Sequence, residues 1–294
     1  MSGLLVLDKP GGMTSHQVVA AVRRITGTRK VGHAGTLDPM ATGVLLVGVG
    51  QATRLLGHLA LHDKEYQATI RLGQTTVTDD AEGDVVDVAS EGELSVIDDN
   101  AIESALAQWR GRVRQIPSSV SAIKVDGKRS YARVRAGEQV ELRPRAVTIS
   151  RLEILEIRRS PDHIDLDVVV ECSSGTYVRA LARDVGASLG VGGHLTMLRR
   201  TRVGAFGLDE SVTLDELREA EAPPQYLLTL GDVGRRCFDV QAIDEAGAVE
   251  IRHGRPLIRA VDSVTAIVDP NGELVALVEP ADTTARYLAV FAPE

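Results

Sequence analysis

The sequence contains few cysteines and no long apolar run, and each shortage excludes a class of protein. Cys172 and Cys237 are the only cysteines among 294 residues, which allows one disulfide at most and no Cys-rich metal site. The longest apolar run, "VLLVGVG", is far below the roughly 20 residues that a membrane span requires. The start, "MSGLLVLDKPGG", has no basic segment of a secretory signal. We therefore expect a soluble, cytoplasmic protein that binds no membrane.

Motifs for metals and nucleotides are also missing. The histidines show no ligand-like pairing with cysteines or carboxylates, and His58 and His62, at positions i and i+4, lack the glutamate of a zinc protease. "LVGVGQAT" has neither the Lys-Ser/Thr of a P-loop nor a GxGxxG frame. We therefore expect no metal, no nucleotide cofactor and no redox cofactor, so that any chemistry depends on side chains alone.

Charge is strongly segregated along the chain. The formal net charge is −8, yet the stretch from Arg110 to Arg145 has ten basic and three acidic residues, a balance of +7. From Asp79 to Glu103 there are ten acidic residues and no basic one. Because binding to phosphates depends on the face that meets them, the basic stretch could bind nucleic acid on an acidic protein. A solvated basic surface is the alternative.

Local patterns in the first half of the chain predict both strands and helices. Residues 3–10 and 43–50 are expected as strands, and residues 65–73 as a half-buried strand with Tyr66, Ala68, Ile70 and Leu72 on one face. A helix is expected over 14–27 with a capping box, and others over 51–62 and 98–111. The acidic stretch between residues 73 and 98 is expected to be a loop.

The second half of the chain continues this mixture. Two long strands are expected over 146–159 and 163–178, and a helix over 178–190. Without a regular βαβ repeat, this order indicates an α+β fold on a mixed, largely antiparallel central sheet. After the linker-like "EAEAPP", residues 235–294 contain a short helix and several strands around an Asp-Pro-Asn-Gly turn, typical of a small β-rich domain. We expect a first domain over 1–230, with a basic insertion at about 110–145, and a second over 235–294.

Asp38 is the first candidate for chemistry. It lies alone in "GHAGTLDPMATG", where Pro39 biases it towards an extended backbone. A catalytic carboxylate and an ordinary turn aspartate are both compatible with this pattern.

Two further segments carry candidate residues. In "SSGTYVRALARDVG", Tyr177 and Arg179 would lie on the same side of an extended chain, and an arginine facing a carboxylate would hold it ionised. An unrelated surface arginine beside a core tyrosine is the alternative. In "KEYQATIRLG", Tyr66 is either a pocket residue or a half-buried strand aromatic.

Five segments together resemble one family. "GLLVLDKPGGMTSHQVV", "GHAGTLDPMATGVL", "KEYQATIRLGQTTVTDDAEG", "IPSSVSAIKVDGKRSYARVRAGE" and "CSSGTYVRALARDVGASLGVGGHLTMLRRTRVG" are similar, in order and spacing, to the TruB family of tRNA pseudouridine synthases, which modify uridine 55 in the T loop. The resemblance covers the chain from about Gly3 to Gly204. It implies an α+β catalytic domain, a cofactor-free isomerisation and a C-terminal PUA-like RNA-binding domain, and we expect a monomer that acts on the tRNA T stem-loop.

The resemblance also assigns roles to residues of the base pocket. Asp38 matches the catalytic aspartate, and Arg179 the arginine that pairs with it. Tyr66 matches the tyrosine that stacks on the target base. Tyr177 belongs to the same pocket, and Leu198 matches an apolar residue that packs against the base.

Other matches concern the RNA and the loops. His33 matches a histidine associated with the rearranged T loop, and Asp80 matches a loop aspartate near the RNA. Lys9 and Pro10 match a motif with a mainly structural role. The chain departs from the pattern at Val120, where several relatives have an aromatic residue. Basic residues of the insertion are expected to hold phosphates: Lys124, Lys128, Arg129, Arg133 and Arg135.

Two other functions are compatible with parts of the sequence. A non-catalytic factor could use the same groove to rearrange tRNA, and this role could coexist with catalysis. An aspartate-based hydrolase is the third hypothesis, but it usually needs a paired acid near the nucleophile, and none is visible beside Asp38.

Overall fold

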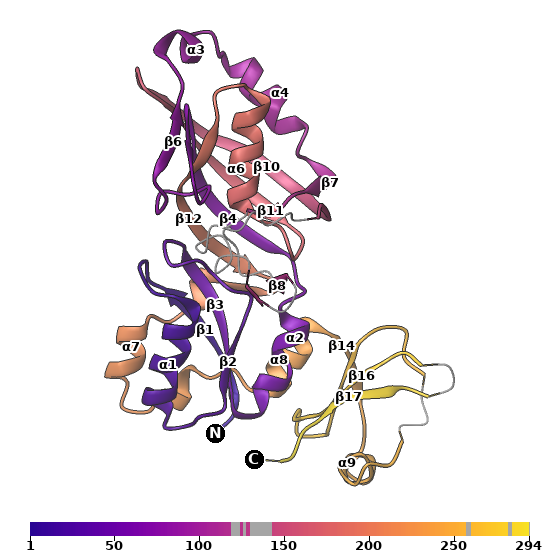
Figure 1. The fold of residues 1–294 in the computed structure, drawn as a ribbon. Coiled ribbons are helices and arrows are strands. Elements are labelled where there is room, and N and C mark those ends of the chain that lie inside the picture. The colour runs from indigo at the N-terminus through magenta and orange to yellow at the C-terminus, as the bar shows by residue number, and fades with distance from the viewer. Residues whose placement is uncertain (119–123, 126–127, 130–142, 257–259, 282–283, 294) are drawn as a thin grey trace. The chain divides into compact units, whose positions relative to one another are not determined.

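The computed structural model describes residues 1–118, 124–125, 128–129, 143–256, 260–281 and 284–293. The chain folds into two compact units (Figure 1). Unit 1 comprises residues 1–39, 43–60 and 203–294, and unit 2 comprises residues 40–42 and 61–202. Both units mix helices with sheet, and the α+β fold class predicted from the sequence is confirmed.

Unit 1 begins with three antiparallel strands and a helix. β1 (Gly3–Lys9) and β2 (Val31–Ala34) both pair with β3 (Thr42–Val49), and α1 (Ser15–Thr26) contacts β2. The predicted capping box of Thr14 and Gln17 is present, and α1 ends at Gly27 in the left-handed region, with φ 65°. Where one helix was expected over 51–62, the chain forms two short pieces, η1 (Gly50–Arg54) and α2 (Leu56–Leu59).

The last third of the chain returns to unit 1. Short elements lead into a sheet with the order β14-β15-β16-β17, in which β14 and β15 are parallel and the other pairs are antiparallel. The expected turn joins β15 to β16, and its Asp269 accepts hydrogen bonds from the backbone of Asn271 and Glu273, both 3.0 Å. The elements are β13 (Phe206–Gly207), η2 (Leu208–Glu210), α7 (Leu214–Glu219), η3 (Pro223–Tyr226), α8 (Leu230–Cys237), β14 (Asp239–Ala242), α9 (Glu245–Arg252), β15 (Thr265–Val268), β16 (Leu274–Glu279) and β17 (Arg286–Val290).

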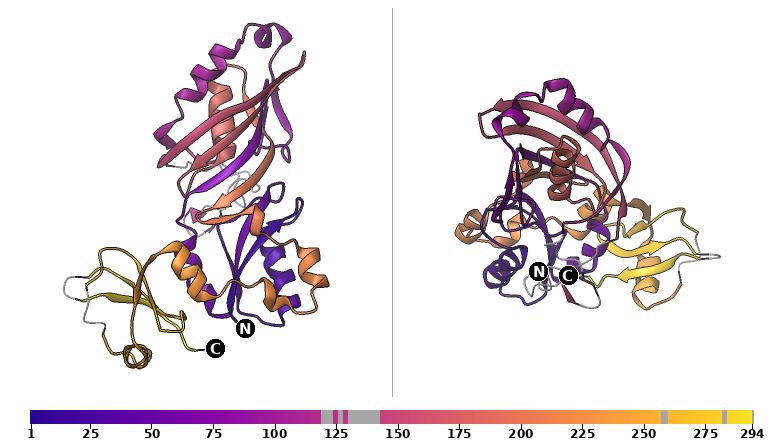
Figure 2. Two further views of the ribbon diagram at one scale, coloured as in Figure 1. Left: turned by 180° about the vertical axis from the view of Figure 1, so that it is seen from behind. Right: turned by 45° about the horizontal axis from the view of Figure 1, so that its top comes forward.

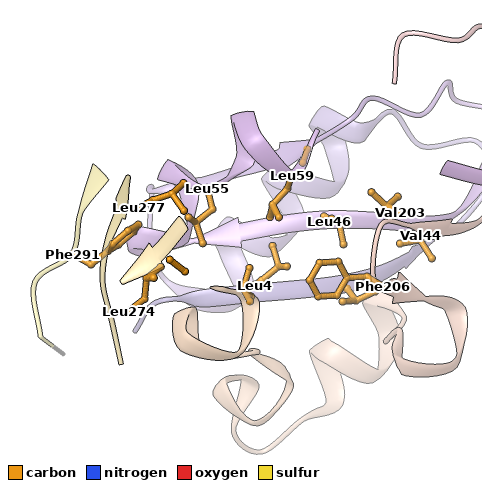
Figure 3. Close-up of a cluster of buried hydrophobic side chains, with 14 residues drawn as sticks. Leu4, Val44, Leu46, Leu55, Leu59, Val203, Phe206, Leu274, Leu277 and Phe291 are labelled. Atoms are coloured by element: carbon orange, nitrogen blue, oxygen red, sulfur yellow. The ribbon is translucent and has the colours of Figure 1, made fainter. Parts of the chain in front are cut away.

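The C-terminal sheet shares a hydrophobic core with the N-terminal strands. Figure 3 shows Leu274, Leu277 and Phe291 of the C-terminal part in one cluster with Leu4 and Leu55. The sheet also has a second cluster of its own, in which Ala248 and Ile251 of α9 pack against its strands. The expected boundary between residues 1–230 and 235–294 therefore separates segments that are packed together, and the domain limits stay a prediction.

Unit 2 is built on strands in the order β12-β4-β11-β10-β7. The registers of β4 with β11, β11 with β10 and β10 with β7 are all antiparallel. Figures 1 and 2 show α6 against one face of this sheet. The elements are β4 (Lys64–Leu72), β5 (Gln74–Thr76), β6 (Val85–Val88), α3 (Glu91–Ser95), α4 (Asp99–Ala107), β7 (Gly111–Gln115), β8 (Lys124–Val125), β9 (Lys128–Arg129), β10 (Arg145–Arg159), β11 (Ile164–Cys172), α6 (Val178–Ser188) and β12 (Gly193–Val203).

Two expectations for unit 2 need correction, and one strand of this unit was not expected. The strand expected over 163–178 ends at Cys172, because a turn with Gly175 at φ 84° follows and the Thr176 hydroxyl bonds to the Ser173 carbonyl at 2.9 Å. The acidic stretch is not only loop, since it forms the β5–β6 hairpin and the capped helix α3. The strand β12 was not predicted at all, because its run of arginines and threonines breaks the apolar alternation.

Among the described helices, none is long and apolar enough to cross a membrane.

Candidate active site

The loop that carries Asp38 is fixed by two buried polar side chains of unit 1. Ser15, at the start of α1, uses its hydroxyl to accept from the Leu37 N–H at 2.9 Å and to donate to the Leu37 carbonyl at 3.0 Å. Lys9, fully buried at the end of β1, donates from Nζ to the carbonyls of Pro39 at 3.1 Å and of Met13 at 2.6 Å. The backbone on both sides of Asp38 is thus held in place, while Asp38 itself is only half-buried.

A glycine turn completes this support. Gly12 adopts φ 78°, a conformation that favours glycine, and its N–H donates to the Pro39 carbonyl at 2.8 Å. Lys9 Nζ also donates to the Pro10 carbonyl at 2.8 Å, so one ammonium group joins the turn after β1 to the loop after β2. The structural role expected for Lys9 and Pro10 is consistent with these contacts, and Ser15 is a supporting residue that the sequence did not reveal.

In unit 2, the side chain of Arg179 binds the tight turn that contains Thr78 and Asp80. Its NH1 donates to the Thr78 carbonyl at 2.9 Å and lies 3.2 Å from Asp80 Oδ2, and both charged side chains are almost completely buried. Asp80 Oδ1 also accepts from the Glu82 N–H at 3.0 Å. Asp80, predicted as an RNA-contacting residue, thus has a partner inside unit 2, and its contact with RNA stays a prediction.

Tyr66 and Leu198 lie on neighbouring strands of the unit 2 sheet. Tyr66 is on β4 and Leu198 on β12, and each is 7% exposed. The predicted face of β4 is confirmed, since Ala68, Ile70 and Leu72 are also buried. A tyrosine and a leucine on adjacent strands can offer an aromatic face and an apolar wall to a flat base.

Tyr177 lies at the point where β11 has ended and α6 begins. It is the N-cap residue of α6, and its backbone is extended, with φ −109° and ψ 104°. Arg179 follows inside the helix, so the alternation that placed both residues on one side of an extended chain does not apply.

A buried lysine next to this region was missed by the sequence analysis. Lys64 lies two residues before Tyr66 on β4, directly opposite Cys172 of β11. Burial lowers the pKa of Lys64 to about 8, and the charge of Arg200 acts in the same direction. Burial raises the pKa of Cys172 to about 11, so this thiol is protonated at neutral pH and is a poor nucleophile. The sequence signal that could have revealed Lys64 is its i, i+2 spacing from Tyr66, which places both side chains on the same face of a strand.

The remaining predicted residues fall in several places. His33 is on β2 of unit 1, with its ring edge-on to His16 at 5.4 Å between centroids. In the basic insertion, Lys124 of β8 lies opposite Arg129 of β9 in the antiparallel backbone register of these two strands, and Lys128 is also on β9. Arg133, Arg135 and Val120 lie outside the described residues. In the part of the chain that the structure describes, no group of three or more His, Cys, Asp or Glu could hold a metal ion.

Solved structures share this fold. The chain matches a Cbf5-Nop10-Gar1 complex with a TM-score of 0.75 and 27% identity, covering 99% of this chain and 85% of the matched chain. It also matches an H/ACA ribonucleoprotein bound to a substrate RNA containing 2′-deoxyuridine, with a TM-score of 0.74, 26% identity and coverage of 99% and 85%.

Sequence comparison is more specific. Residues 23–178 match the TruB family pseudouridylate synthase N-terminal domain, residues 179–229 the tRNA pseudouridylate synthase B C-terminal domain, and residues 238–292 the tRNA pseudouridine synthase II C-terminal domain. The tRNA pseudouridine synthase B of Cutibacterium acnes is 58% identical over 96% of this chain and 94% of its own length. That of Nocardia farcinica is 54% identical over 100% and 94%.

These matches and the fold define the class of the protein, an RNA-modifying isomerase that makes pseudouridine. Within that class, the chain belongs to the TruB family of pseudouridine synthases, and its substrate is tRNA. The resemblance predicted from the sequence motifs is confirmed.

Proposed function

We propose that this enzyme converts uridine 55 in the T loop of tRNA to pseudouridine, with Asp38 as the catalytic carboxylate acting on a flipped-out base. The observation that carries the proposal is the support of the Asp38 loop. Lys9 and Ser15, both buried, hold the backbone at Leu37 and Pro39, while the carboxylate between them stays half-buried. A reactive group on a fixed backbone that still reaches solvent is the arrangement that catalysis by positioning requires.

The reaction rearranges bonds within one nucleotide. The C1′–N1 bond breaks, the uracil turns, a C5–C1′ bond forms, the C5 proton leaves and N1 ends with a proton. Nothing is oxidised and no group is lost, so a single carboxylate can serve. As an anion it can add to an electron-poor carbon, or take a proton, and depart again. Attack at C1′, attack at C6 and removal of the C2′ proton all require the carboxylate in the same position.

The base must leave the RNA stack before Asp38 can reach it. Extrusion of a nucleotide costs a few kcal/mol, and a loop nucleotide costs less than one in a duplex. Stacking on an aromatic ring such as Tyr66 returns roughly 1–3 kcal/mol. We assign Tyr66, Tyr177 and Leu198 to the base pocket and Arg179 to the charge of Asp38. His33, Asp80 and the basic insertion are assigned to the surrounding RNA.

The test uses purified enzyme with unmodified tRNA and with an isolated T stem-loop, without added metal or nucleotide. Pseudouridine is mapped by nucleotide position. We expect formation at position 55 in both RNAs. Formation only at another position would refute the assignment of the substrate.

The role of Asp38 is tested separately by Asp38→Asn. The variant should bind tRNA like the wild type, because the backbone contacts of its loop are unchanged, and should lose turnover entirely. Asp215→Asn, which changes an exposed carboxylate of α7, is the matched control and should keep full activity. Turnover that survives in Asp38→Asn would remove Asp38 from the chemistry.

A further inference from the structure

The end of β7 is tied to the start of α6 by one glutamine side chain. Gln115 is the last residue of β7 and is 1% exposed. Its Nε2 donates to the Tyr177 carbonyl at 3.0 Å, and its Oε1 accepts from the Tyr177 N–H at 2.8 Å. One amide therefore satisfies both peptide groups of the same residue, in the way that a partner strand would.

This contact lies at the residue from which α6 starts. Tyr177 is the N-cap, and its side chain makes no capping bond. Its carbonyl also accepts the first intrahelical bond from the Leu181 N–H at 3.1 Å. Gln115 thus fixes the position and direction of the backbone just where the chain presents Tyr177 and, two residues later, Arg179.

Gln115 is itself held from two sides. It pairs with Arg145 on β10, and the carbonyl of the next residue, Ile116, accepts from Arg183 NH2 at 2.7 Å. Arg183 is one helical turn after Arg179, and its NH1 lies 3.2 Å from Asp79 Oδ2. Asp79 adopts φ 59°, which is uncommon for a residue with a side chain. One face of α6 therefore binds both the turn that holds Arg179 and the strand end that holds Tyr177.

We propose that Gln115 is a positioning residue for pseudouridine formation, which acts by fixing the Tyr177 backbone and makes no contact with RNA. The inference rests on the proposed place of Tyr177 in the base pocket. Its physical basis is that a displacement of about 1 Å of a group that orients a substrate can reduce a rate about a hundredfold. A purely structural glutamine would affect folding without separating catalysis from tRNA binding.

The test compares Gln115→Met, which keeps the size of the side chain and removes both hydrogen bonds, with the wild type. We expect the single-turnover rate, measured with enzyme in excess over tRNA, to fall by about ten- to a hundredfold. The Kd for tRNA should stay within about threefold, since phosphate contacts dominate affinity. Gln108→Met is the matched control, because Gln108 is the exposed C-cap residue of α4 and its side chain donates to the Ser104 carbonyl of the same helix at 3.3 Å. It should keep the wild-type rate.

A double-mutant cycle shows whether Gln115 acts through Tyr177. In a Tyr177→Ala background, Gln115→Met should reduce the rate by less than about threefold, because there is no longer a ring to misplace. If Gln115→Met does not fold, Gln115→Glu keeps the acceptor and replaces the donor, and the same separation of rate from Kd is expected.

Three results would overturn the inference. The first is a single-turnover rate of Gln115→Met within about twofold of the wild type, and the second is weaker tRNA binding in place of a slower rate. The third is an equal loss of rate from Gln115→Met in the wild-type and the Tyr177→Ala enzymes. Failure of the proposed function would look different, because the wild-type enzyme itself would then make no pseudouridine at position 55.

Discussion

At the scale of single residues, a buried lysine organises the backbone around the proposed catalytic carboxylate. A buried polar group is tolerated when its hydrogen bonds are made inside the protein. Lys9 Nζ bonds three carbonyls, those of Pro10, Met13 and Pro39, from the end of a strand that is largely apolar. Its ammonium group thus supplies hydrogen bonds to backbone carbonyls of two loops, where no helix or strand supplies them.

A partly buried ion pair of unit 2 gives a prediction about pH. Arg71 binds Asp165 through two hydrogen bonds of 2.8 Å. Burial alone would raise the pKa of Asp165, but the bonds from Arg71 outweigh it and hold this pKa below its usual value. The stabilisation is therefore complete above the unfolded-state pKa of about 4 and is lost as the pH falls through the folded-state value.

We expect Asp165→Asn to reduce the free energy of unfolding by about 1–2 kcal/mol at pH 7. The difference from the wild type should shrink as the pH falls below about 4, the unfolded-state pKa, and should be lost once the pH is below the lower pKa that Asp165 has in the folded protein. Urea unfolding at both pH values measures this. Asp215→Asn is the control and should change little at either pH. A difference that does not vary with pH would show that the ion pair is not its source.

At the scale of elements, hydrogen bonding within turns overrides the simple strand pattern. Residues 163–178 alternate well enough to predict one strand, yet the bond from Thr176 to Ser173 and the left-handed Gly175 end β11 early. The chain then turns into α6. As a result Arg179 and Arg183 lie one turn apart on a helix face, where both reach the turn at residues 78–80.

The basic insertion gives a prediction at this scale. Replacing Arg129 and Arg133 together with glutamine should weaken tRNA binding and reduce the slope of log K against log salt by about 1.5–2, if both residues meet phosphates. The combination of Arg158→Gln and Arg218→Gln is the control, because both arginines are paired with carboxylates. The measurement is the tRNA binding constant of each variant over a range of salt concentrations. A slope equal to that of the wild type would mean that Arg129 and Arg133 face solvent and not phosphates.

At the scale of the whole molecule, unit 1 is discontinuous in sequence. The C-terminal sheet matches a domain of its own in the family, over residues 238–292, yet it buries Phe291 and Leu277 in one cluster with residues from β1 and β3. The side chain of Gln51 makes two hydrogen bonds of 2.9 Å with the backbone of Ala292: its Nε2 donates to the carbonyl, and its Oε1 accepts from the N–H. We infer that the PUA-like sheet stabilises the N-terminal strands as well as serving RNA binding.

Phe291→Ala tests this coupling. Removal of a buried aromatic ring from a packed core costs about 3–5 kcal/mol, and we expect unfolding of the whole chain at correspondingly lower urea. Val240→Ala, at an exposed position on β14, should change stability by less than about 0.5 kcal/mol. Unfolding of the C-terminal sheet alone, with the rest of the chain unaffected, would contradict the shared core.

Local patterns in the sequence determined much of this protein. The capping box of α1, the buried face of β4 and the turn between β15 and β16 depend on residues close together in the chain, so they could be predicted. The family, and with it the activity on tRNA, also followed from motifs that are read without a structure.

Only the tertiary structure decided which side chains hold the site. Ser15 supports Leu37 from 22 residues away, Gln115 bonds Tyr177 from 62 residues away, and Arg179 reaches Thr78 across 101 residues. No periodicity predicts such pairs, because they depend on how strands and helices pack once the chain has folded. The sequence motifs indicate which side chains can take part in the reaction. Which other side chains hold them in position depends on the packing of segments that are distant in the chain.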